Sequence, residues 1–356
     1  MTENLPTGFA RCKLGDLITL KRGYDLPHRD RKEGEFPIVS SSGITGYHNE
    51  AKVEGPGVVT GRYGTLGEVF FVQGEFWPLN TALYVQDFKG NDPRFISYFL
   101  QTIGLGTKNT AGAVPGVNRN VLHRLQVIAP DLPKQKEIVK VLSAYDDLID
   151  NNNRRIALLE EAIHRLYREW FVHLRFPGHE NTPVVAGVPE GWEKRPLEKV
   201  GFLNYGKSLP KRNREDGDVP VYGSSGIVGT HNKALIPGPS IIVGRKGNVG
   251  SVFWSDQSSF PIDTVFYIAP EESSIFLYLN LQNQNFINTD AAVPGLNRNY
   301  AHKLPVLVPT ERLLAQFEEM ATPIHKQITT LQNYNAKLAE ARDALLPRLM
   351  NGSLAV

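Results

Sequence analysis

The strongest constraint on this chain is that its sequence repeats itself over a long distance. Shifted by 183 residues, the segment from Gly23 to Ala51 matches the segment from Gly206 to Ala234 without a gap. The match continues from GPGVVTGRYGTLGEVFF to GPSIIVGRKGNVGSVFW, and about 26 of the 62 positions compared are identical. This similarity is well above chance and predicts two copies of one domain.

A second match, at an offset of 179 residues, places AVPGVNRNVLHRL from Ala113 over AVPGLNRNYAHKL from Ala292. In both copies Gly and Pro recur between short β-branched runs, such as residues 56–60 and 239–243. This pattern is typical of short strands joined by tight turns. We therefore predict an α+β fold with two strand-rich repeats.

Each copy is followed by a segment with apolar residues at alternating spacings of three and four, which predicts a long helix. The first series is Ile138, Leu142, Tyr145, Ile149, Asn152, Ile156, Leu159, Ile163, Leu166 and Trp170. The second is Ile324, Ile328, Leu331, Asn335, Leu338, Leu345 and Leu349, with Pro323 near its start and Arg342 interrupting it. Because a lone apolar stripe is unfavourable in water, we expect an antiparallel coiled coil, with Asn152 setting register and a pseudo-twofold axis relating the halves.

The predicted domain order follows from these repeats and helices. It is a first repeat (1–130), a long helix (131–175), a linker rich in Pro and Gly (176–190), a second repeat (191–309) and a second long helix (310–356). Within residues 131–175 roughly 38 residues are expected to be helical, which at 1.5 Å per residue gives a length of about 57 Å. That length is suited to a spacer between two similar domains.

The remaining composition indicates a soluble cytoplasmic protein. Cys12 is the single cysteine, so neither an intrachain disulfide nor a thiolate cluster is expected. No stretch resembles a signal peptide or a membrane span. The formal net charge of +2 neither requires nor excludes a polyanionic partner.

The repeated strings resemble the DNA-specificity (S) subunit of type I restriction-modification systems. They are SSSGITGYHN with GSSGIVGTHN, GRYGTLG with GRKGNVG, PGVNRN with PGLNRN, and the C-terminal RDALLPRLMNG. The resemblance implies two target-recognition domains that each read one half of a split double-stranded DNA site. It also implies that the long helices hold these domains apart and dock modification subunits.

The resemblance further implies that this chain is not an enzyme. Catalysis would belong to two DNA-methyltransferase (modification) subunits and to restriction/translocase subunits. Adenine-N6 methylation would use S-adenosylmethionine on the former, and DNA cleavage would use ATP and Mg on the latter. No cofactor, metal or membrane is expected for this chain itself.

Arg62 and Arg245 are the first candidate DNA-binding residues, because each lies in a glycine-flanked turn that can approach a groove. Arginine is the commonest reader of guanine. The alternative is an ordinary surface salt bridge. Lys246 stands where the first copy has Tyr63, so we expect this position to help distinguish the two half-sites.

Further candidates lie in the serine turns and in the PGVNRN and PGLNRN segments. They are Ser41, Ser42, His48, Ser224, Ser225, His231, Asn118, Arg119, Asn297 and Arg298. As alternatives, the serines would stabilise a turn, the asparagines would cap a short helix and the arginines would pair with acids. No ligand cluster accompanies the two histidines, so a metal role is not expected.

Two other functions are alternatives to DNA specificity. GFLNYGKS (Gly201–Ser208) satisfies a phosphate-loop pattern, but Leu209 and Pro210 follow where a helix is required. A protein-binding adaptor with two repeated interaction domains is the main alternative.

Because the two copies are so alike, DNA recognition would involve half-sites that resemble each other in inverted orientation.

Overall fold

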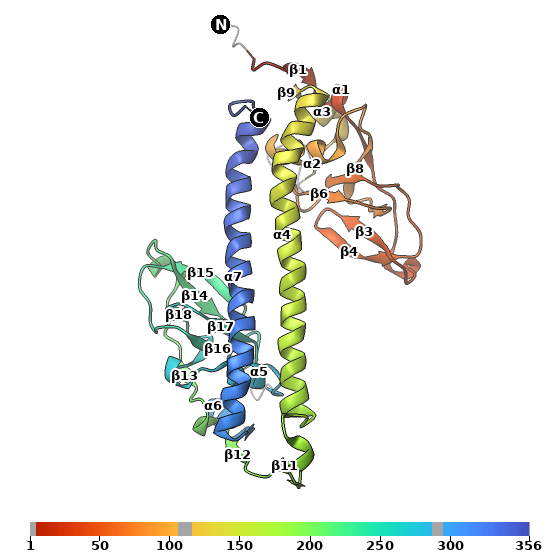
Figure 1. Ribbon diagram of the computed structural model, residues 1–356. Helices are drawn as coiled ribbons and strands as arrows, with labels where there is room; N and C mark the ends of the chain where they lie inside the picture. Colours follow the sequence, from red (N-terminus) through yellow and green to blue (C-terminus); the bar gives the residue numbers. More distant parts are fainter. Residues whose placement is uncertain (1–4, 106–115, 287–294, 356) are drawn as a thin grey trace. The chain divides into compact units, whose positions relative to one another are not determined.

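The computed structural model describes residues 5–105, 116–286 and 295–355, and the chain divides into two compact units. The first unit comprises residues 1–152 and 333–356, and the second comprises residues 153–332. The long helices α4 (Leu132–Tyr167) and α7 (Glu311–Met350) therefore each contribute one part to each unit (Figure 1).

The first unit contains three small sheets. Strand β1 pairs antiparallel with β9, the second sheet has the order β2-β8-β5-β6, and the third has the order β4-β3-β7 with β3 and β7 parallel. The strands are β1 (Phe9–Lys13), β2 (Thr19–Arg22), β3 (Phe36–Ser40), β4 (Gly43–His48), β5 (Gly57–Gly61), β6 (Val69–Val72), β7 (Trp77–Pro78), β8 (Ala82–Asp87) and β9 (Gln126–Pro130). The short helices are α1 (Leu14–Leu17), η1 (His28–Asp30), α2 (Pro93–Thr102) and α3 (Arg119–His123).

The second unit repeats this topology. Its sheets have the orders β12-β20, β13-β19-β16-β17 and β15-β14-β18. The strands are β12 (Glu193–Pro196), β13 (Asn204–Tyr205), β14 (Val219–Gly223), β15 (Gly226–His231), β16 (Ser240–Gly244), β17 (Val252–Ser255), β18 (Phe260–Pro261), β19 (Val265–Ile268) and β20 (Pro305–Val308). The short helices are η5 (Leu197–Lys199), η6 (Lys211–Asn213), η7 (Pro270–Glu272), α5 (Ile275–Gln282) and α6 (Arg298–His302).

The segment after α4 connects the helix to the second repeat. Helix α4 continues as a π-helical turn, η3 (Arg168–Val172), so its regular part ends before the predicted boundary at residue 175. A 3-10 turn, η4 (His179–Asn181), and a two-stranded hairpin, β10 (Val184–Val185) with β11 (Val188–Pro189), follow. The five-part division predicted from the sequence stays a prediction. In the structure, each compact unit instead combines one repeat with parts of both long helices.

The sheet registers establish that the two repeats are structurally equivalent. Arg22 pairs with Leu83 in the first unit, and Tyr205 pairs with Phe266 in the second. Both residues of the second pair lie 183 positions after those of the first. The predicted duplication of a strand-rich domain is therefore confirmed at the level of individual strand pairs.

The first unit packs its repeat onto parts of both long helices. Asp92 caps α2 by accepting hydrogen bonds from the backbone amides of Arg94 and Phe95, and Pro93 occupies the first helical position. The buried core contains Leu14, Leu20, Leu83, Phe95, Ile96 and Phe99 together with Ile138 and Leu142 of α4 and Leu346 and Leu349 of α7. Burial of each such side chain contributes about 1.5–3 kcal/mol.

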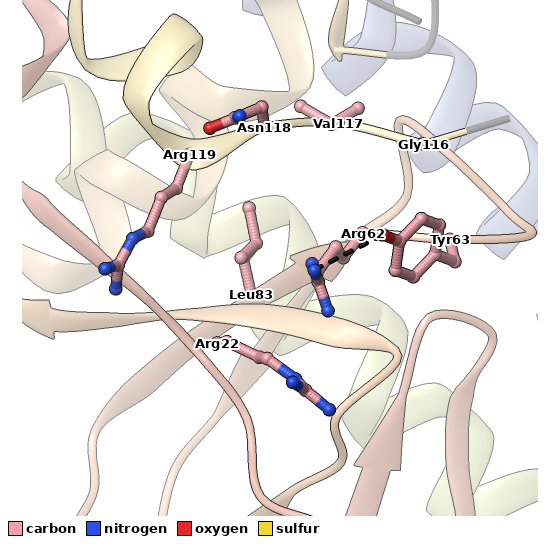
Figure 2. A pocket seen from close by; sticks show the side chains of 8 residues that line it. All are labelled: Arg22, Arg62, Tyr63, Leu83, Gly116, Val117, Asn118 and Arg119. Carbon is pink, nitrogen blue, oxygen red and sulfur yellow. Dashed lines mark hydrogen bonds between the residues drawn. The ribbon is translucent and has the colours of Figure 1, made fainter. Parts of the chain in front are cut away.

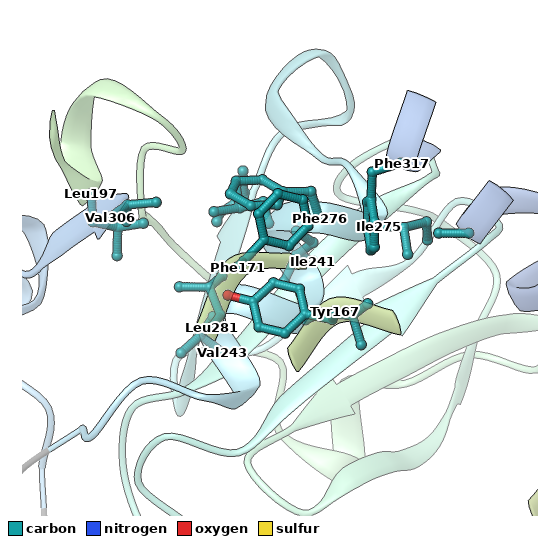
Figure 3. Packing of buried hydrophobic residues seen from close by; sticks show 14 of the residues in the cluster. Tyr167, Phe171, Leu197, Ile241, Val243, Ile275, Phe276, Leu281, Val306 and Phe317 are labelled. Atoms are coloured by element: carbon teal, nitrogen blue, oxygen red, sulfur yellow. The ribbon is translucent and has the colours of Figure 1, made fainter. Parts of the chain in front are cut away.

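The core of the second unit is rich in aromatic rings (Figure 3). Phe171 lies edge-on to Phe276 of α5 and to Phe317 of α7, with ring centroids 4.8 and 4.9 Å apart. Glu318 of α7 accepts hydrogen bonds from the backbone amides of Ile275 and Phe276 at 3.3 and 2.7 Å. The carboxylate thus satisfies amides at the start of α5 that have no partner within that helix.

The predicted apolar series on α4 and α7 form the contacts between these helices within each unit. In the second unit, Ile156, Ile328 and Leu331 form one buried cluster. In the first unit, Asn152 donates a hydrogen bond from Nδ2 to Oδ1 of Asn335 at 2.9 Å. The antiparallel pairing is therefore confirmed, and the buried Asn152 has a polar partner in the other helix.

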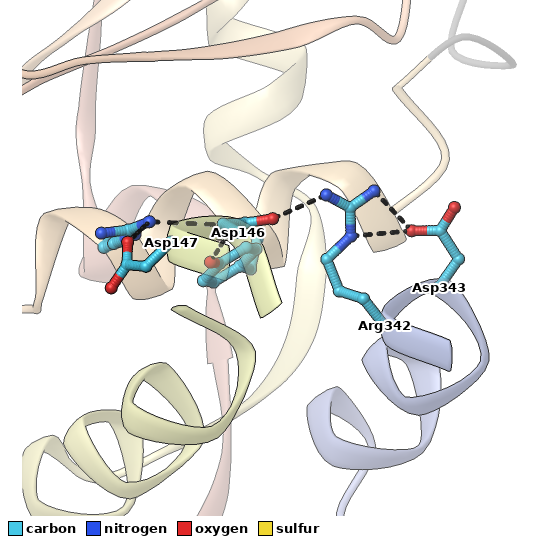
Figure 4. Close-up of polar contacts among 6 residues, drawn as sticks. Asp146, Asp147, Arg342 and Asp343 are labelled. Atoms are coloured by element: carbon cyan, nitrogen blue, oxygen red, sulfur yellow. Dashed lines mark hydrogen bonds and ion pairs between the residues drawn. The ribbon is translucent and has the colours of Figure 1, made fainter. Parts of the chain in front are cut away.

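Arg342, which interrupts the second apolar series, is held by an ion pair in the first unit (Figure 4). Its Nη1 lies 2.6 Å from Oδ1 of Asp146, and Nη2 lies 2.8 Å from Asp343. The Tyr98 hydroxyl also donates to Asp146, and Arg94 lies 3.0 Å from Asp147. Burial and the hydrogen bond to Asp146 both raise the pKa of Tyr98, so this tyrosine is neutral when it donates.

We predict that Arg342→Ala lowers the free energy of unfolding by about 1–3 kcal/mol, because it leaves the partly buried Asp146 without its closest cation. Arg348→Ala, on an exposed position of the same helix, should change stability by less than about 0.5 kcal/mol. Urea unfolding monitored by circular dichroism measures both values. Equal effects of the two substitutions would contradict a structural role for the ion pair.

Candidate nucleic-acid interface

A tight glycine turn positions the candidate arginine of each repeat. Gly61 ends β5 and Gly244 ends β16. A Cβ atom on Gly61 would overlap the Thr65 carbonyl oxygen, and one on Gly244 would overlap that of Asn248. Glycine is therefore required for the chain to fold back so closely, and Arg62 and Arg245 lie directly after it.

Backbone hydrogen bonds join this turn to the PGVNRN or PGLNRN segment. In the first unit the Arg62 amide donates to Thr81 at 2.9 Å, and the Arg62 carbonyl accepts from Val117 at 3.0 Å. In the second unit Arg245 makes the corresponding bonds to Thr264 and Leu296, at 2.9 and 2.8 Å. Two segments that are far apart in the sequence therefore form one site in each repeat.

The side chain of Arg62 stacks on the aromatic ring of its neighbour, and no acidic side chain of the described residues pairs with it. Its guanidinium lies 4.5 Å from the centre of the Tyr63 ring, and Nη2 donates to the Tyr63 hydroxyl at 3.3 Å. The ion pairs found within the described residues include neither Arg62 nor Arg119. The alternative that Arg62 forms a surface salt bridge is therefore not supported.

A pocket of about 400 Å³ opens beside this turn in the first unit (Figure 2). Its lining residues are Arg22, Arg62, Tyr63, Leu83, Gly116, Val117, Asn118 and Arg119. Three arginines therefore line this pocket together with Leu83. A concave surface with several cations is suited to the phosphates and polar edges of a nucleic acid.

In the second unit the equivalent arginines stack on an aromatic ring. The guanidinium groups of Arg245 and Arg298 lie 4.9 and 4.5 Å from the centre of the Tyr205 ring. Arg245 also donates to the Asp263 carbonyl at 3.1 Å, whereas Nε of Arg298 is buried without a hydrogen-bond partner among the described residues. Lys246 follows Arg245 and is exposed.

The predicted asparagines cap the short helices α3 and α6. Asn118 accepts a hydrogen bond from the Asn120 amide at 2.9 Å, and Asn297 accepts one from Tyr300 at 3.2 Å. The capping alternative is therefore confirmed. Arg119 and Arg298 begin these helices, so the caps also fix the position of the two arginines.

The serine turns lie against the arginine turns in both repeats. Oγ of Ser41 would lie 3.7 Å from a Cβ atom on Gly64, and Oγ of Ser224 would lie 3.1 Å from one on Gly247. Ser42 is exposed, and its hydroxyl pairs with that of Ser40 at 3.0 Å. Ser225 occupies the corresponding exposed position, so the serines both stabilise the turn and extend its polar surface.

His48 and His231 do not belong to this surface, contrary to the prediction that they contact DNA. Their exposed fractions are 4% and 7%. Nδ1 of His48 accepts a hydrogen bond from the backbone amide of Lys32 at 3.0 Å. Nδ1 of His231 accepts one from the backbone amide of Glu215 at 3.1 Å. A buried ring that accepts a backbone hydrogen bond is not available to a base edge.

Arg22 and Tyr205 are site residues that the sequence analysis missed. They occupy equivalent strand positions but differ chemically, so a search for repeated strings passes over them. Two other basic residues, Arg31 and Arg214, donate to the carbonyls of Thr45 in β4 and Val228 in β15, at 3.3 and 2.7 Å.

The alternative chemistries find no structural basis in the described residues. The first regular element after Lys207 is the 3-10 turn η6, so the phosphate-loop pattern does not lead into an α-helix. Within residues 5–105, 116–286 and 295–355 no three His, Cys, Asp or Glu side chains are grouped to hold a metal. None of the helices described combines the length and the apolar character needed to cross a membrane.

Comparison with known proteins identifies the repeat. A family model described as the type I restriction modification DNA specificity domain matches residues 6–161 and 189–309. The type I restriction enzyme HindI specificity subunit of Haemophilus influenzae is 23% identical over 334 residues, covering 69% of this chain and 73% of that protein. The MjaIX specificity subunit of Methanocaldococcus jannaschii is 24% identical over 274 residues, covering 68% of this chain and 63% of that protein.

A solved structure shares the fold over nearly the whole chain. The S subunit of a type I restriction-modification system from M. genitalium superposes with a TM-score of 0.67 at 16% sequence identity. The alignment covers 98% of both chains. At 16% identity this similarity concerns the fold alone. It supports a fold in which two repeats are combined with long helices.

We predict that Gly61→Ala disrupts the arginine turn, because the added Cβ atom overlaps the Thr65 carbonyl. The expected cost is about 1–3 kcal/mol, with increased hydrogen exchange at Arg62 and Val117. Gly74→Ala is the matched control, since nothing lies within 4 Å of its Cβ position. Indistinguishable exchange in the two variants would show that the turn does not need glycine.

Proposed function

We propose a function that starts from one premise: the chain belongs to the type I restriction-modification DNA specificity family. Specificity subunits of this family are non-catalytic, and partner subunits carry the catalysis. We propose that this chain binds a bipartite double-stranded DNA site, with each repeat reading one half. The bound chain would then determine where the partner subunits act.

One observation carries this proposal. Both repeats present an arginine directly after a glycine turn, joined by equivalent hydrogen bonds to a second segment that begins with a capped arginine. Two copies of one cationic site in a single chain fit a target with two halves. An adaptor that binds proteins is less well supported, because the family and both relatives described above are defined by DNA specificity.

The proposed DNA-binding residues divide by their expected contacts. Arginine and lysine side chains would contact phosphates or guanine, whereas the serines and asparagines would contact sugar, phosphate or base edges. The first group is Arg62, Arg119, Arg245, Lys246 and Arg298. The second is Ser41, Ser42, Ser224, Ser225, Asn118 and Asn297.

The domain assignment and partners belong to the same proposal. The recognition domains would be residues 1–130 and 191–309, separated by the helices at 131–175 and 310–356 and related by a pseudo-twofold axis. Two methyltransferase subunits and restriction/translocase subunits would dock on this frame in the cytoplasm. They would bring S-adenosylmethionine, ATP and Mg, so this chain needs no cofactor of its own.

We predict that co-expression with the cognate methyltransferase subunit creates a new methylated-adenine motif divided by a fixed unread gap. Two similar half-sites in inverted orientation are expected, because the two sites share one backbone frame. Single-molecule sequencing of genomic DNA measures this, and cells with the methyltransferase subunit alone provide the control. A partner that binds this chain yet produces no new motif would contradict the proposed function.

We predict that Arg245→Ala weakens binding to the full site by about tenfold or more, the expected loss for a direct base or charged contact. When the half-site read by the second repeat is scrambled, the same substitution should have little further effect. Lys194→Ala, an exposed residue of β12, is the charge-matched control. Fluorescence anisotropy with labelled duplexes measures the affinities, and equal losses on intact and scrambled sites would contradict half-site assignment.

A further inference from the structure

The two arginine sites have the same backbone arrangement but differ at two side-chain positions. At each position one repeat has a tyrosine and the other has a cation. At the end of β2 the first unit has Arg22, and the equivalent residue of β13 is Tyr205. In the arginine turn the first unit has Tyr63, and the equivalent residue is Lys246. Among the described residues, each site therefore has three cations and one tyrosine, but in different places.

In the second unit the tyrosine takes the inner position. The Tyr205 ring lies under both Arg245 and Arg298, with guanidinium to ring-centre distances of 4.9 and 4.5 Å. Such cation-π contacts hold two arginines together without neutralising their charge. The third cation, Lys246, is exposed on the turn.

In the first unit the inner position carries a guanidinium instead. Arg22 lines the same pocket as Arg62, Leu83 and Arg119 (Figure 2). The ion pairs of the described residues give these three arginines one acidic partner, Asp25, 3.4 Å from Arg22. Both side chains of that pair are at least half exposed, so the pair contributes little and can be replaced by a stronger anion.

We propose that the pocket formed by Arg22, Arg62 and Arg119 binds a DNA backbone phosphate, and that Arg22 makes this contact specific to the first recognition domain. The inference rests on the proposed DNA-binding function and adds a subsite to it. Three arginines lining one cavity are suited to an oxyanion with several acceptor oxygens, whereas one base edge is read by a single bidentate arginine.

The equivalent position in the second domain holds no cation, because Tyr205 stands there. The first domain would therefore be fixed on its half-site by a phosphate held within the pocket. The second would use Lys246 on the outer turn. The two domains would then hold DNA through different phosphates despite having the same fold.

The test uses Arg22→Tyr, which places in β2 the residue that the second repeat carries at the same sheet position. The full chain is titrated with a labelled duplex containing its split site at several salt concentrations. Loss of one phosphate contact should reduce the slope of log Kobs against log salt by about 0.9. If the plots for the wild type and the variant meet near 1 M salt, this slope change corresponds to an affinity about eightfold lower for the variant at 0.1 M salt.

Three further variants act as controls. Arg22→Gln removes the charge without adding a ring, so it should reproduce the slope change of Arg22→Tyr even if tyrosine is poorly accommodated. Arg22→Lys keeps the charge and should retain the wild-type slope. Lys194→Gln removes an exposed charge of β12 outside both arginine sites, so it should leave the slope unchanged.

The outcomes separate this inference from the proposed function. If the wild-type chain binds its split site but neither Arg22→Gln nor Arg22→Tyr changes the salt slope, the phosphate contact is wrong and the proposed function stands. If these variants keep the slope but alter the methylated sequence of one half-site, Arg22 reads a base and the inference is equally overturned. A wild-type chain that binds no duplex would overturn the proposed function itself.

Discussion

The structure depends on the burial of each repeat against parts of both long helices. In the first unit, Ile138 and Leu142 of α4 and Leu346 and Leu349 of α7 belong to the same core as the repeat. In the second unit Phe317 of α7 and Tyr167 of α4 do so. Because residues of both helices belong to the largest buried cluster of each unit, the helices are components of the domains.

This arrangement explains why both cationic sites keep the same backbone while their side chains differ. The strands that carry the sites pair in identical registers, and the arginine turns make equivalent hydrogen bonds. Exposed positions such as Tyr63 and Lys246 can change without disturbing that frame. Duplication followed by substitution at such positions gives two different contact surfaces on one stable scaffold.

The sequence predicted the features that depend on repetition and periodicity. The duplicated domain, both helices and the arginine turns follow from matched strings and apolar spacing. It did not predict that His48 is buried against Trp77, because burial depends on contacts between strands that a string comparison does not contain. Arg22 and Tyr205 were missed for a related reason: their equivalence is visible only in the strand pairing.

The polar pair between the helices shows how two similar halves are kept in one register. Helices α4 and α7 begin 179 residues apart, so Asn152 corresponds to Leu331 and Asn335 corresponds to Ile156. The hydrogen-bonded pair Asn152–Asn335 in the first unit therefore corresponds to two members of the apolar cluster in the second. A shift of one helix along the other would place a buried amide against an apolar side chain, which is strongly unfavourable. This asymmetry gives an otherwise repetitive helix pair a single favourable alignment, and with it fixes which part of each helix packs on which repeat.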